Sequence, residues 1–335
     1  MKQTRFAFLL TLLALIVGGC AEPDNSGNTS DSDSSQAGTD GNQKVIAYST
    51  MDLTNPFFNV ISDHMKTEGE KRGYKVITVS GDNATKQAEQ IDDFIVQGVD
   101  AIVLTPTDPK SLGQAIKKAN EAGIPVFTND TAHDGEEGEV KCHIATDNLQ
   151  GGRLAGEAMV KLLGESGGNV YIIHKPDAAS CILRVQGFRE IVDAHNATEG
   201  AAQIKVVGEG NGDGKRDIGY NVAKDAIVAN QDLSAIFAIN DPCALGARTA
   251  LEEAGKQDQV TIIGFDGEKA GKEAIRDGKI LCDPIQFPDQ MGKMTVEIID
   301  RYMNGEEFEK KILIESSLYY KKDADQDPEL KESNE

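Results

Sequence analysis

The sequence predicts an α/β fold made of two similar doubly wound parallel-sheet lobes. The main observation is an internal repeat, because residues 100–130 are predicted to form a strand, a helix and a strand, and residues 234–266 repeat that order. Each copy ends on a carboxylate, Asp130 in the first and Asp266 in the second. Ligands of such sheets bind beyond the carboxyl ends of the strands. We therefore expect these two side chains to face one another across a cleft.

Within the first copy, residues 101–104 form an apolar run typical of a buried strand. Asp108-Pro109 predicts a helix start, with the aspartate as N-cap and the proline in the first turn. Gly123 ends that helix before the next apolar run. In the second copy Asp241-Pro242 predicts the equivalent helix start.

The remaining elements follow from apolar periodicity and from Gly, Pro and Asn at their ends. Asn55-Pro56 begins a helix whose apolar positions include Phe57 and Phe58. These two phenylalanines are adjacent, so either both belong to the core or one of them faces the cleft. The other expected strands are residues 44–49, 74–79, 169–174, 204–208, 280–285 and 312–315, and the other helices are residues 86–97, 181–195, 217–229, 270–277 and 289–303.

Composition excludes some classes of partner. The chain has 335 residues, with 34 Lys and Arg against 55 Asp and Glu, which gives a formal net charge of −21. Nucleic acid is a poor partner for such a chain. The chain has no Trp, so an aromatic platform for a ligand must be Phe or Tyr.

The N-terminal residues predict export. Lys2 and Arg5 precede an apolar run at residues 6–17, as in a signal peptide. The sequence Val-Gly-Gly-Cys ending at Cys20 resembles the lipobox of bacterial lipoproteins, which implies cleavage after residue 19 and lipidation of Cys20. The alternative is an ordinary signal peptide followed by an incidental cysteine. Residues 20–43 are rich in Ser, Asp, Asn and Gly and predict a disordered tether to the membrane.

Neither a metal site nor a cofactor is expected. The cysteines after Cys20 include no C-x-x-C pair, and the five histidines are scattered. Cys181 and Cys243 both follow strands of the second lobe, so they are candidates for a disulfide; four buried free thiols is the alternative that we favour. The G-x-S-x-G motif at residues 164–168 lies between a helix and a strand, which is the reverse of a nucleophile elbow. We expect no enzymatic activity.

Several motifs together resemble those of one family, the ribose-type sugar-binding proteins of bacterial ABC importers, which have the type I periplasmic binding protein fold. The motifs are Thr-Asn-Pro-Phe-Phe at residues 54–58, His-Ile-Ala-Thr-Asp-Asn at 143–148, Ile-Gly-Phe-Asp-Gly at 263–267 and Gln-Phe-Pro-Asp-Gln at 286–290. The resemblance extends over residues 45–317. It implies two lobes that close on a monosaccharide and are joined by a three-segment hinge.

The resemblance also implies which residues contact the sugar. Carried over position by position, they are Ser49, Asn55, Phe57, Phe58, Asp130, Thr131, Arg184, Asn240, Asp266 and Gln286. Two positions depart from the family pattern. Thr131 stands where ribose binders have an arginine, and Gly214 stands where they have an aromatic residue. The expected ligand is therefore a monosaccharide or related polyol that need not be ribose.

These observations predict a monomeric, lipid-anchored receptor, periplasmic or at the cell surface, that delivers its ligand to an ABC permease. The alternative is a sugar sensor that docks on a membrane chemoreceptor or kinase. The predicted domains are a signal peptide (1–19), a tether (20–43), an N-terminal lobe (44–146 and 287–315), a C-terminal lobe (147–286 and 316–322) and an acidic, frayed tail (323–335).

Overall fold

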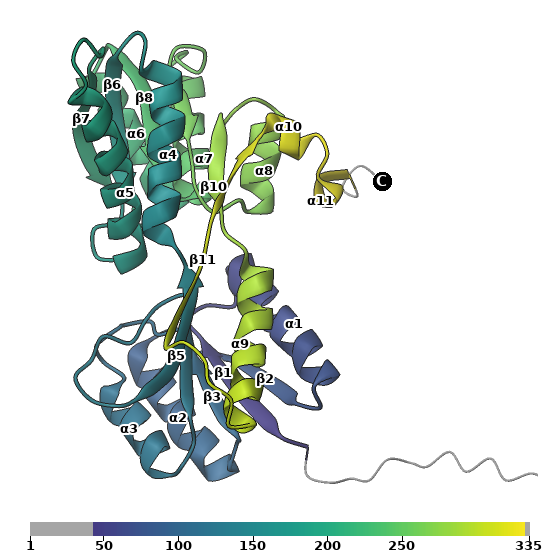
Figure 1. Ribbon diagram of the computed structural model, residues 1–335. Helices are drawn as coiled ribbons and strands as arrows, with labels where there is room; N and C mark the ends of the chain where they lie inside the picture. The colour runs from purple at the N-terminus through teal and green to yellow at the C-terminus, as the bar shows by residue number, and fades with distance from the viewer. Residues whose placement is uncertain (1–42, 332–335) are drawn as a thin grey trace, which may run out of the picture. The chain divides into compact units, whose positions relative to one another are not determined.

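The computed structural model describes residues 43–331, which form two six-stranded sheets with helices between most successive strands (Figure 1). The predicted signal peptide, Cys20 and nearly all of the predicted tether lie outside the described residues. The α/β fold with two parallel-sheet lobes is confirmed.

The first lobe contains the sheet with strand order β11-β5-β4-β3-β1-β2, in which all neighbours are parallel. Its strands are β1 (Val45–Thr50), β2 (Lys75–Ser80), β3 (Ala101–Leu104), β4 (Val126–Asn129), β5 (Val140–Thr146) and β11 (Lys311–Ile314). Its helices are α1 (Pro56–Lys71), α2 (Ala84–Gln97), α3 (Gly113–Glu121) and α9 (Pro288–Met303).

The second lobe contains the sheet with order β12-β10-β9-β8-β6-β7, in which only β12 is antiparallel to its neighbour. Its strands are β6 (Gly168–His174), β7 (Ile204–Asn211), β8 (Leu233–Ala238), β9 (Thr261–Ile263), β10 (Cys282–Ile285) and β12 (Ser317–Tyr320). Its helices are α4 (Asn148–Leu163), α5 (Ala179–Asn196), α6 (Arg216–Ala229), α7 (Asp241–Glu253), α8 (Lys269–Arg276), α10 (Lys321–Ala324) and α11 (Pro328–Lys331).

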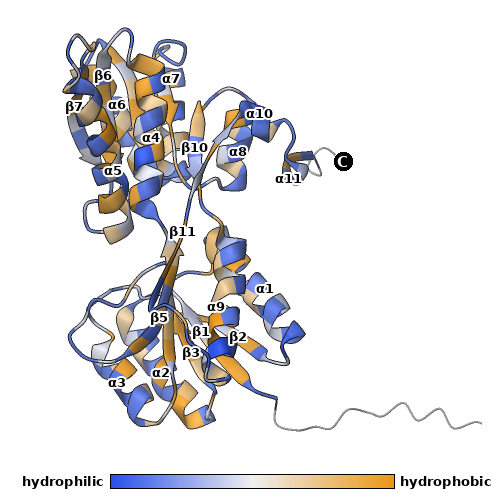
Figure 2. Cartoon of the chain, in the orientation of Figure 1, coloured by the Kyte–Doolittle hydropathy of each residue, from blue (hydrophilic) through white to orange (hydrophobic). Residues whose placement is uncertain are grey.

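The strands are buried on both faces because helices cover both sides of each sheet. Successive residues of a strand point to opposite faces. On β1, Ile46 and Tyr48 accordingly pack with α1 and α9, whereas Ala47 packs with α2 and α3. On β8 the same alternation separates Ile236 from Phe237. This double burial explains why the central strands appear as continuous apolar runs (Figure 2).

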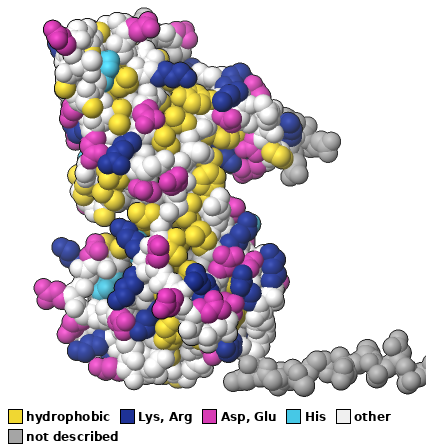
Figure 3. All heavy atoms as spheres, viewed as in Figure 1, with side chains coloured by type: hydrophobic (Ala, Val, Ile, Leu, Met, Phe, Trp, Pro, Cys, Tyr) yellow, Lys and Arg dark blue, Asp and Glu magenta, His cyan; other side chains and the backbone are white. Residues whose placement is uncertain are grey.

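The surface carries charges of both signs, which are interspersed on the face shown in Figure 3.

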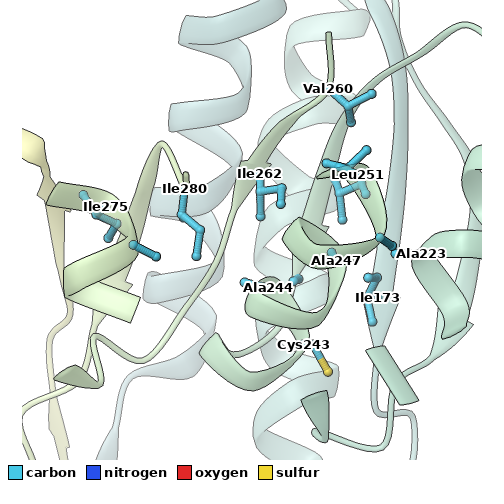
Figure 4. Close-up of a cluster of buried hydrophobic side chains, with 14 of the residues drawn as sticks. Ile173, Ala223, Cys243, Ala244, Ala247, Leu251, Val260, Ile262, Ile275 and Ile280 are labelled. Atoms are coloured by element: carbon cyan, nitrogen blue, oxygen red, sulfur yellow. The ribbon is translucent and has the colours of Figure 1, made fainter. Parts of the chain in front are cut away.

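The core of the second lobe includes small residues of α7 that pack against β8 and β9. Figure 4 shows Ala244 and Ala247 of this helix beside Ile262, with Leu251 one turn further along. Small side chains on α7 let the helix lie close to the sheet. The helix begins at the sheet's carboxyl edge because it follows the end of β8 in the chain.

The chain passes between the two sheets three times, after β5, after β10 and after β11. Hydrogen bonds link these segments to each other. The side-chain hydroxyl of Thr146 donates to Oε1 of Gln286 at 2.7 Å, and the backbone nitrogen of Ser316 donates to Oε1 of Gln150 at 2.9 Å. The three segments thus form one hydrogen-bonded bundle.

One helix start was predicted wrongly. Asp108-Pro109 does not begin α3, which starts at Gly113 without a side-chain cap. Asp108 instead accepts a hydrogen bond from the backbone nitrogen of Lys110 at 2.8 Å, and the segment forms a turn. The later start brings Gly113 under the backbone of Glu137, where a Cβ would lie 2.8 Å from the carbonyl oxygen.

The prediction of a frayed tail is also wrong for the residues up to 331. Ala324 and Leu330 are both 2% exposed and belong to the core of the second lobe. The hydroxyl of Tyr319 donates to the carboxylate of Asp327 at 2.8 Å, so this segment is fixed by polar contacts as well. The acidic composition of this segment gave no indication that Ala324 and Leu330 are buried in the core.

Two carboxyl groups are buried together at the carboxyl edge of the second sheet. Asp241 begins α7, Asp283 lies in β10, and both are fully buried. Oδ2 of Asp241 accepts from the backbone nitrogen of Glu268 at 2.6 Å, and the carboxyl of Asp283 lies against Asp241 and the backbone of Gly264. Burial raises the pKa of Asp283 to about 7 and also raises that of Asp241, whose pKa is further raised by Asp283. We infer that the pair retains a proton up to near-neutral pH.

Replacing Asp283 with Asn should therefore stabilise the protein at alkaline pH. The folded-state pKa of Asp283 lies above its ordinary value, so folding favours the protonated form, and this stability is lost as pH rises from about 4 to about 7. The side-chain amide of the Asp283→Asn variant cannot ionise and can donate to Asp241. At pH 8 the variant should be more stable by about 1–3 kcal/mol, a rise in Tm of several degrees.

Calorimetric melting of both proteins across pH 4 to 8 checks this, with the exposed Asp193→Asn on α5 as the charge-matched control. A variant that is less stable than the parent at pH 8 would mean that Asp283 is ionised and favourably solvated in the native protein.

Candidate functional site

Asp130 and Asp266 occupy equivalent positions in the two lobes. Asp130 follows β4 with φ 56°, and Asp266 follows β9 with φ 106°. Each backbone nitrogen bonds a carbonyl of the next strand, Asp130 to Ile144 at 2.9 Å and Asp266 to Pro284 at 3.1 Å. A positive φ is uncommon outside glycine, although Asp tolerates it better than most residues. The repeat in the sequence therefore corresponds to a repeated, unusual backbone turn that carries a carboxylate.

These two carboxylates line one cavity of about 120 Å³, whose walls come from both lobes. Eight of the ten residues predicted to bind the ligand are among its walls: Asn55, Phe57, Phe58, Asp130, Arg184, Asn240, Asp266 and Gln286. The structure thus brings together residues that are up to 231 positions apart in the sequence, from Asn55 to Gln286.

The first lobe contributes the beginning of α1. The side chain of Asn55 caps this helix, and its Oδ1 accepts from the backbone nitrogen of Phe57 at 2.9 Å. Within residues 43–331 its amide nitrogen makes no hydrogen bond, so this donor is available to a ligand. Phe58 is buried and Phe57 half-buried, and their rings meet edge to face at 5.3 Å. Phe58 belongs to the core and also lines the cavity. Core packing and exposure to the cleft, the two alternatives for this pair, therefore occur together.

The second lobe contributes Arg184 of α5, which is 5% exposed. Its Nε donates to Oδ1 of Asn148 at 2.8 Å, and its Nη1 donates to the carbonyl of Ile239 at 2.7 Å and to Oδ1 of Asp266 at 2.8 Å. The guanidinium also lies 3.8 Å from the centre of the Phe265 ring. Arg184 is therefore a buried structural residue and a wall of the cavity at once.

Gln286 connects this network to the segments between the lobes. Its Nε2 donates to Oδ1 of Asp266 at 2.6 Å, and its Oε1 accepts from Thr146 at 2.7 Å. The Asp266 carboxylate is thus held by Arg184 of the second lobe and by a residue that follows β10 at a crossing.

Asn240 is the N-cap of α7. Its Oδ1 accepts from the backbone nitrogen of Cys243 at 3.1 Å, and its Nδ2 donates to the carbonyl of Gly214 at 3.0 Å. Gly214 has a φ of 68° and also lines the cavity. A glycine at the position where the family has an aromatic residue leaves room on this wall.

The cavity perturbs its carboxyl groups. Burial raises the pKa of Asp130 to about 6, an effect that Arg184 opposes and Asp266 reinforces. Burial also raises the pKa of Asp266, against the lowering influence of Arg184 and Gln286. The pKa of Glu268 is raised to about 7 by burial and by the nearby Asp266 and Asp283. Carboxyl groups with pKa values raised in this way can gain or lose a proton, and so change their charge, at near-neutral pH.

Two predicted residues are not walls of the cavity. Ser49 is fully buried in β1, where its hydroxyl donates to Oε1 of Gln90 on α2 at 2.7 Å, so the prediction for this residue is corrected. Thr131 lies beside the cavity, and its hydroxyl is 3.4 Å from Oδ2 of Asp130.

Sequence reasoning missed several walls, notably Lys175, Ser180, Cys181, Ile239 and Glu268. A signal for two of them was present, because Lys175 directly follows β6 and Glu268 follows Asp266 by two residues at the same sheet edge. Lys175 Nζ lies 2.5 Å from Oδ1 of Asp213, so this cation is already paired.

Other candidate chemistry is limited in residues 43–331. No group of three or more His, Cys, Asp or Glu side chains is placed to hold a metal ion there. Cys142, Cys181, Cys243 and Cys282 are buried free thiols, so Cys181 and Cys243 are not joined. None of the helices in this part of the chain has the length and apolar character needed to cross a membrane.

Comparison with known proteins places this architecture in a family. Residues 46–307 match the periplasmic binding protein domain. The chain is 35% identical over 278 residues to the ribose import binding protein RbsB of Salmonella typhimurium, with 83% of this chain and 90% of that protein covered. It is 33% identical over 306 residues to the RbsB of Bacillus subtilis, with 91% and 92% covered.

Solved structures agree. A periplasmic solute-binding protein of an ABC transporter from Actinobacillus succinogenes, with bound D-allose, superposes with a TM-score of 0.78 at 25% identity, over 84% of this chain and 99% of that one. The myo-inositol binding protein of Caulobacter superposes with a TM-score of 0.76 at 26% identity, over 87% and 98%. The relatives are solute-binding transport proteins, which fits a role other than catalysis. Fold, cavity and sequence identity together show that the chain belongs to the ribose-type sugar-binding proteins of the periplasmic binding protein family.

Proposed function

We propose that this protein is a lipid-anchored extracytoplasmic receptor that binds a monosaccharide or related polyol between two closing lobes and delivers it to an ABC permease. The observation that carries the proposal is the cavity, whose polar and aromatic walls come from both lobes. A ligand that bonds to both sets of walls favours the closed arrangement, since it gains contacts there that neither lobe alone provides.

The walls have the chemistry that a sugar needs. Sugar hydroxyls both donate and accept, so carboxylates such as Asp130 and amides such as Asn55 can each satisfy one or more of them. The apolar face of a sugar ring suits the Phe57 and Phe58 rings.

The identity of the sugar depends on the two departures from the ribose pattern. Thr131 supplies no guanidinium beside Asp130, and Gly214 supplies no ring. Structural neighbours of this chain hold D-allose and myo-inositol, so the same fold accepts sugars and polyols of different shapes. We infer that the site binds a sugar or polyol that need not be ribose.

The first test is a thermal-shift screen of pentoses, hexoses and polyols, followed by calorimetry on Asp130→Ala and Asp266→Ala with the best ligand. A ligand that binds only the native state raises Tm. Each variant loses a charged acceptor worth about 1.5–3 kcal/mol, so affinity should fall about 10- to 200-fold.

The two variants should differ in stability. Asp130 makes no ion pair in the described part of the chain, so Asp130→Ala should lower the apo Tm only slightly, by the cost of placing alanine at a positive φ. Asp266→Ala strands the buried Arg184, so it should also lower the apo Tm. Asp193→Ala on the exposed face of α5 is the control. Unchanged affinity in both cavity variants would place the ligand elsewhere.

A separate prediction concerns the anchor. Replacing Cys20 with Ser removes the thioether-forming sulfur of the Val-Gly-Gly-Cys motif, so the variant should move from the membrane fraction to the soluble fraction. Cell fractionation with immunoblotting measures this, and Cys142→Ser, which alters a buried thiol of the first lobe, is the matched control. A processed Cys20→Ser protein that still fractionates with membranes would contradict lipidation at this residue.

A further inference from the structure

Two carboxyl groups that line the cavity form no ion pair in the described part of the chain. Asp130 lines it from the first lobe and Glu268 from the second. Among residues 43–331 neither makes an ion pair, and the one side-chain hydrogen bond that Asp130 makes is with the uncharged Thr131 at 3.4 Å.

The two cations in the cavity walls are already engaged. The Arg184 guanidinium is paired with Asp266 at 2.8 Å and shares its other bonds with Asn148 and Ile239. Lys175 Nζ lies 2.5 Å from Asp213 and 3.7 Å from Asp177, both outside the cavity walls. Because both cations are paired elsewhere, neither forms an ion pair with Asp130 or Glu268, and Asp130 feels only the longer-range attraction of Arg184.

Acids on the open surface are in a different situation. Glu190, for example, is exposed and pairs with Arg153 at 2.8 Å. Water can hydrate the part of its carboxylate that Arg153 does not contact. Asp130 and Glu268 are half-buried, which removes part of that hydration, and their pKa values rise to about 6 and about 7. The charged groups that face Asp130 are Arg184, which lowers its pKa, and Asp266, which raises it. Glu268 faces the carboxyls of Asp266 and Asp283, so negative charge predominates around Glu268.

We propose that the ligand is a sugar or polyol that carries a positively charged nitrogen, as in an amino sugar, and that Asp130 and Glu268 select for it. This inference rests on the proposed sugar-receptor function and narrows its ligand class. An ammonium group donates to carboxylates and supplies the charge that the cavity lacks, whereas the hydroxyl of a neutral sugar supplies only the hydrogen bond.

The test is calorimetric titration of the full chain with matched pairs that differ only in the nitrogen: D-glucosamine with D-glucose, D-galactosamine with D-galactose, D-mannosamine with D-mannose, and glucamine with sorbitol. N-acetyl-D-glucosamine, which keeps the nitrogen without the charge, is a further probe. At least one amine should bind about 10-fold or more tightly than its neutral partner.

The same amine should bind about 10- to 100-fold more weakly to Glu268→Gln or Asp130→Asn, and with unchanged affinity to Glu165→Gln, which removes an exposed carboxylate of the same lobe as Glu268. Melting of each variant separates a folding defect from a binding defect, and the two cavity variants provide independent readings. If neutral sugars bind as tightly as the amines or more tightly, the inference is wrong and the receptor function stands. If neither neutral nor amino sugars bind, the proposed function itself fails.

The pH dependence provides a second reading. Affinity for the amine should rise between about pH 5 and about pH 7, because Asp130 and Glu268 lose their protons over that range. Affinity that falls over the same range would indicate that protonated carboxyls donate to a neutral ligand, and would overturn the inference.

Discussion

The buried guanidinium of Arg184 is the interaction on which the arrangement of the site depends. It joins Asn148, which follows one crossing between the lobes, to the carbonyl after β8 and to the Asp266 carboxylate. Gln286, at another crossing, bonds the same carboxylate. A buried arginine needs several acceptors at fixed positions. This requirement fixes the positions of two strand ends, one helix start and one crossing relative to each other.

That network also explains how the cavity can be acidic without disrupting the fold. Asp266 is paired with Arg184, so its charge is balanced before a ligand binds. Asp130 and Glu268 make no ion pair among the described residues, and we infer that Asp241 and Asp283, which are buried next to Glu268, retain a proton. The second lobe therefore concentrates ionisable groups at one sheet edge, where a ligand or a proton must balance them.

Much of this arrangement could be predicted from the sequence, for a physical reason. Repeated apolar runs, each ending on an aspartate, define strand ends, and parallel strands bring those ends to one edge. Asp130, Asp266 and Asn240 were predictable for that reason. Ser49 was not, because its placement depends on how many residues separate β1 from α1, and pattern alone does not fix that geometry.

Other features depended on tertiary contacts. Asp108-Pro109 has the local signature of a helix start, yet the chain turns there before α3 begins. Leu330 lies in an acidic segment that is too short to show the apolar periodicity of a helix. It is held in place because its side chain packs into the core of the second lobe. Glu268 stands near a predicted site residue, but its unpaired state could be recognised only once its neighbours were placed.

The most direct test of the central claim is a crystal structure of the protein with the ligand that the screen identifies. We expect the ligand between the lobes, with its polar groups about 2.7–3.2 Å from Asp130, Asp266 and Asn240, and with the Arg184–Asp266 bond retained. A ligand bound outside this cavity, or a complex in which Arg184 leaves Asp266, would contradict it.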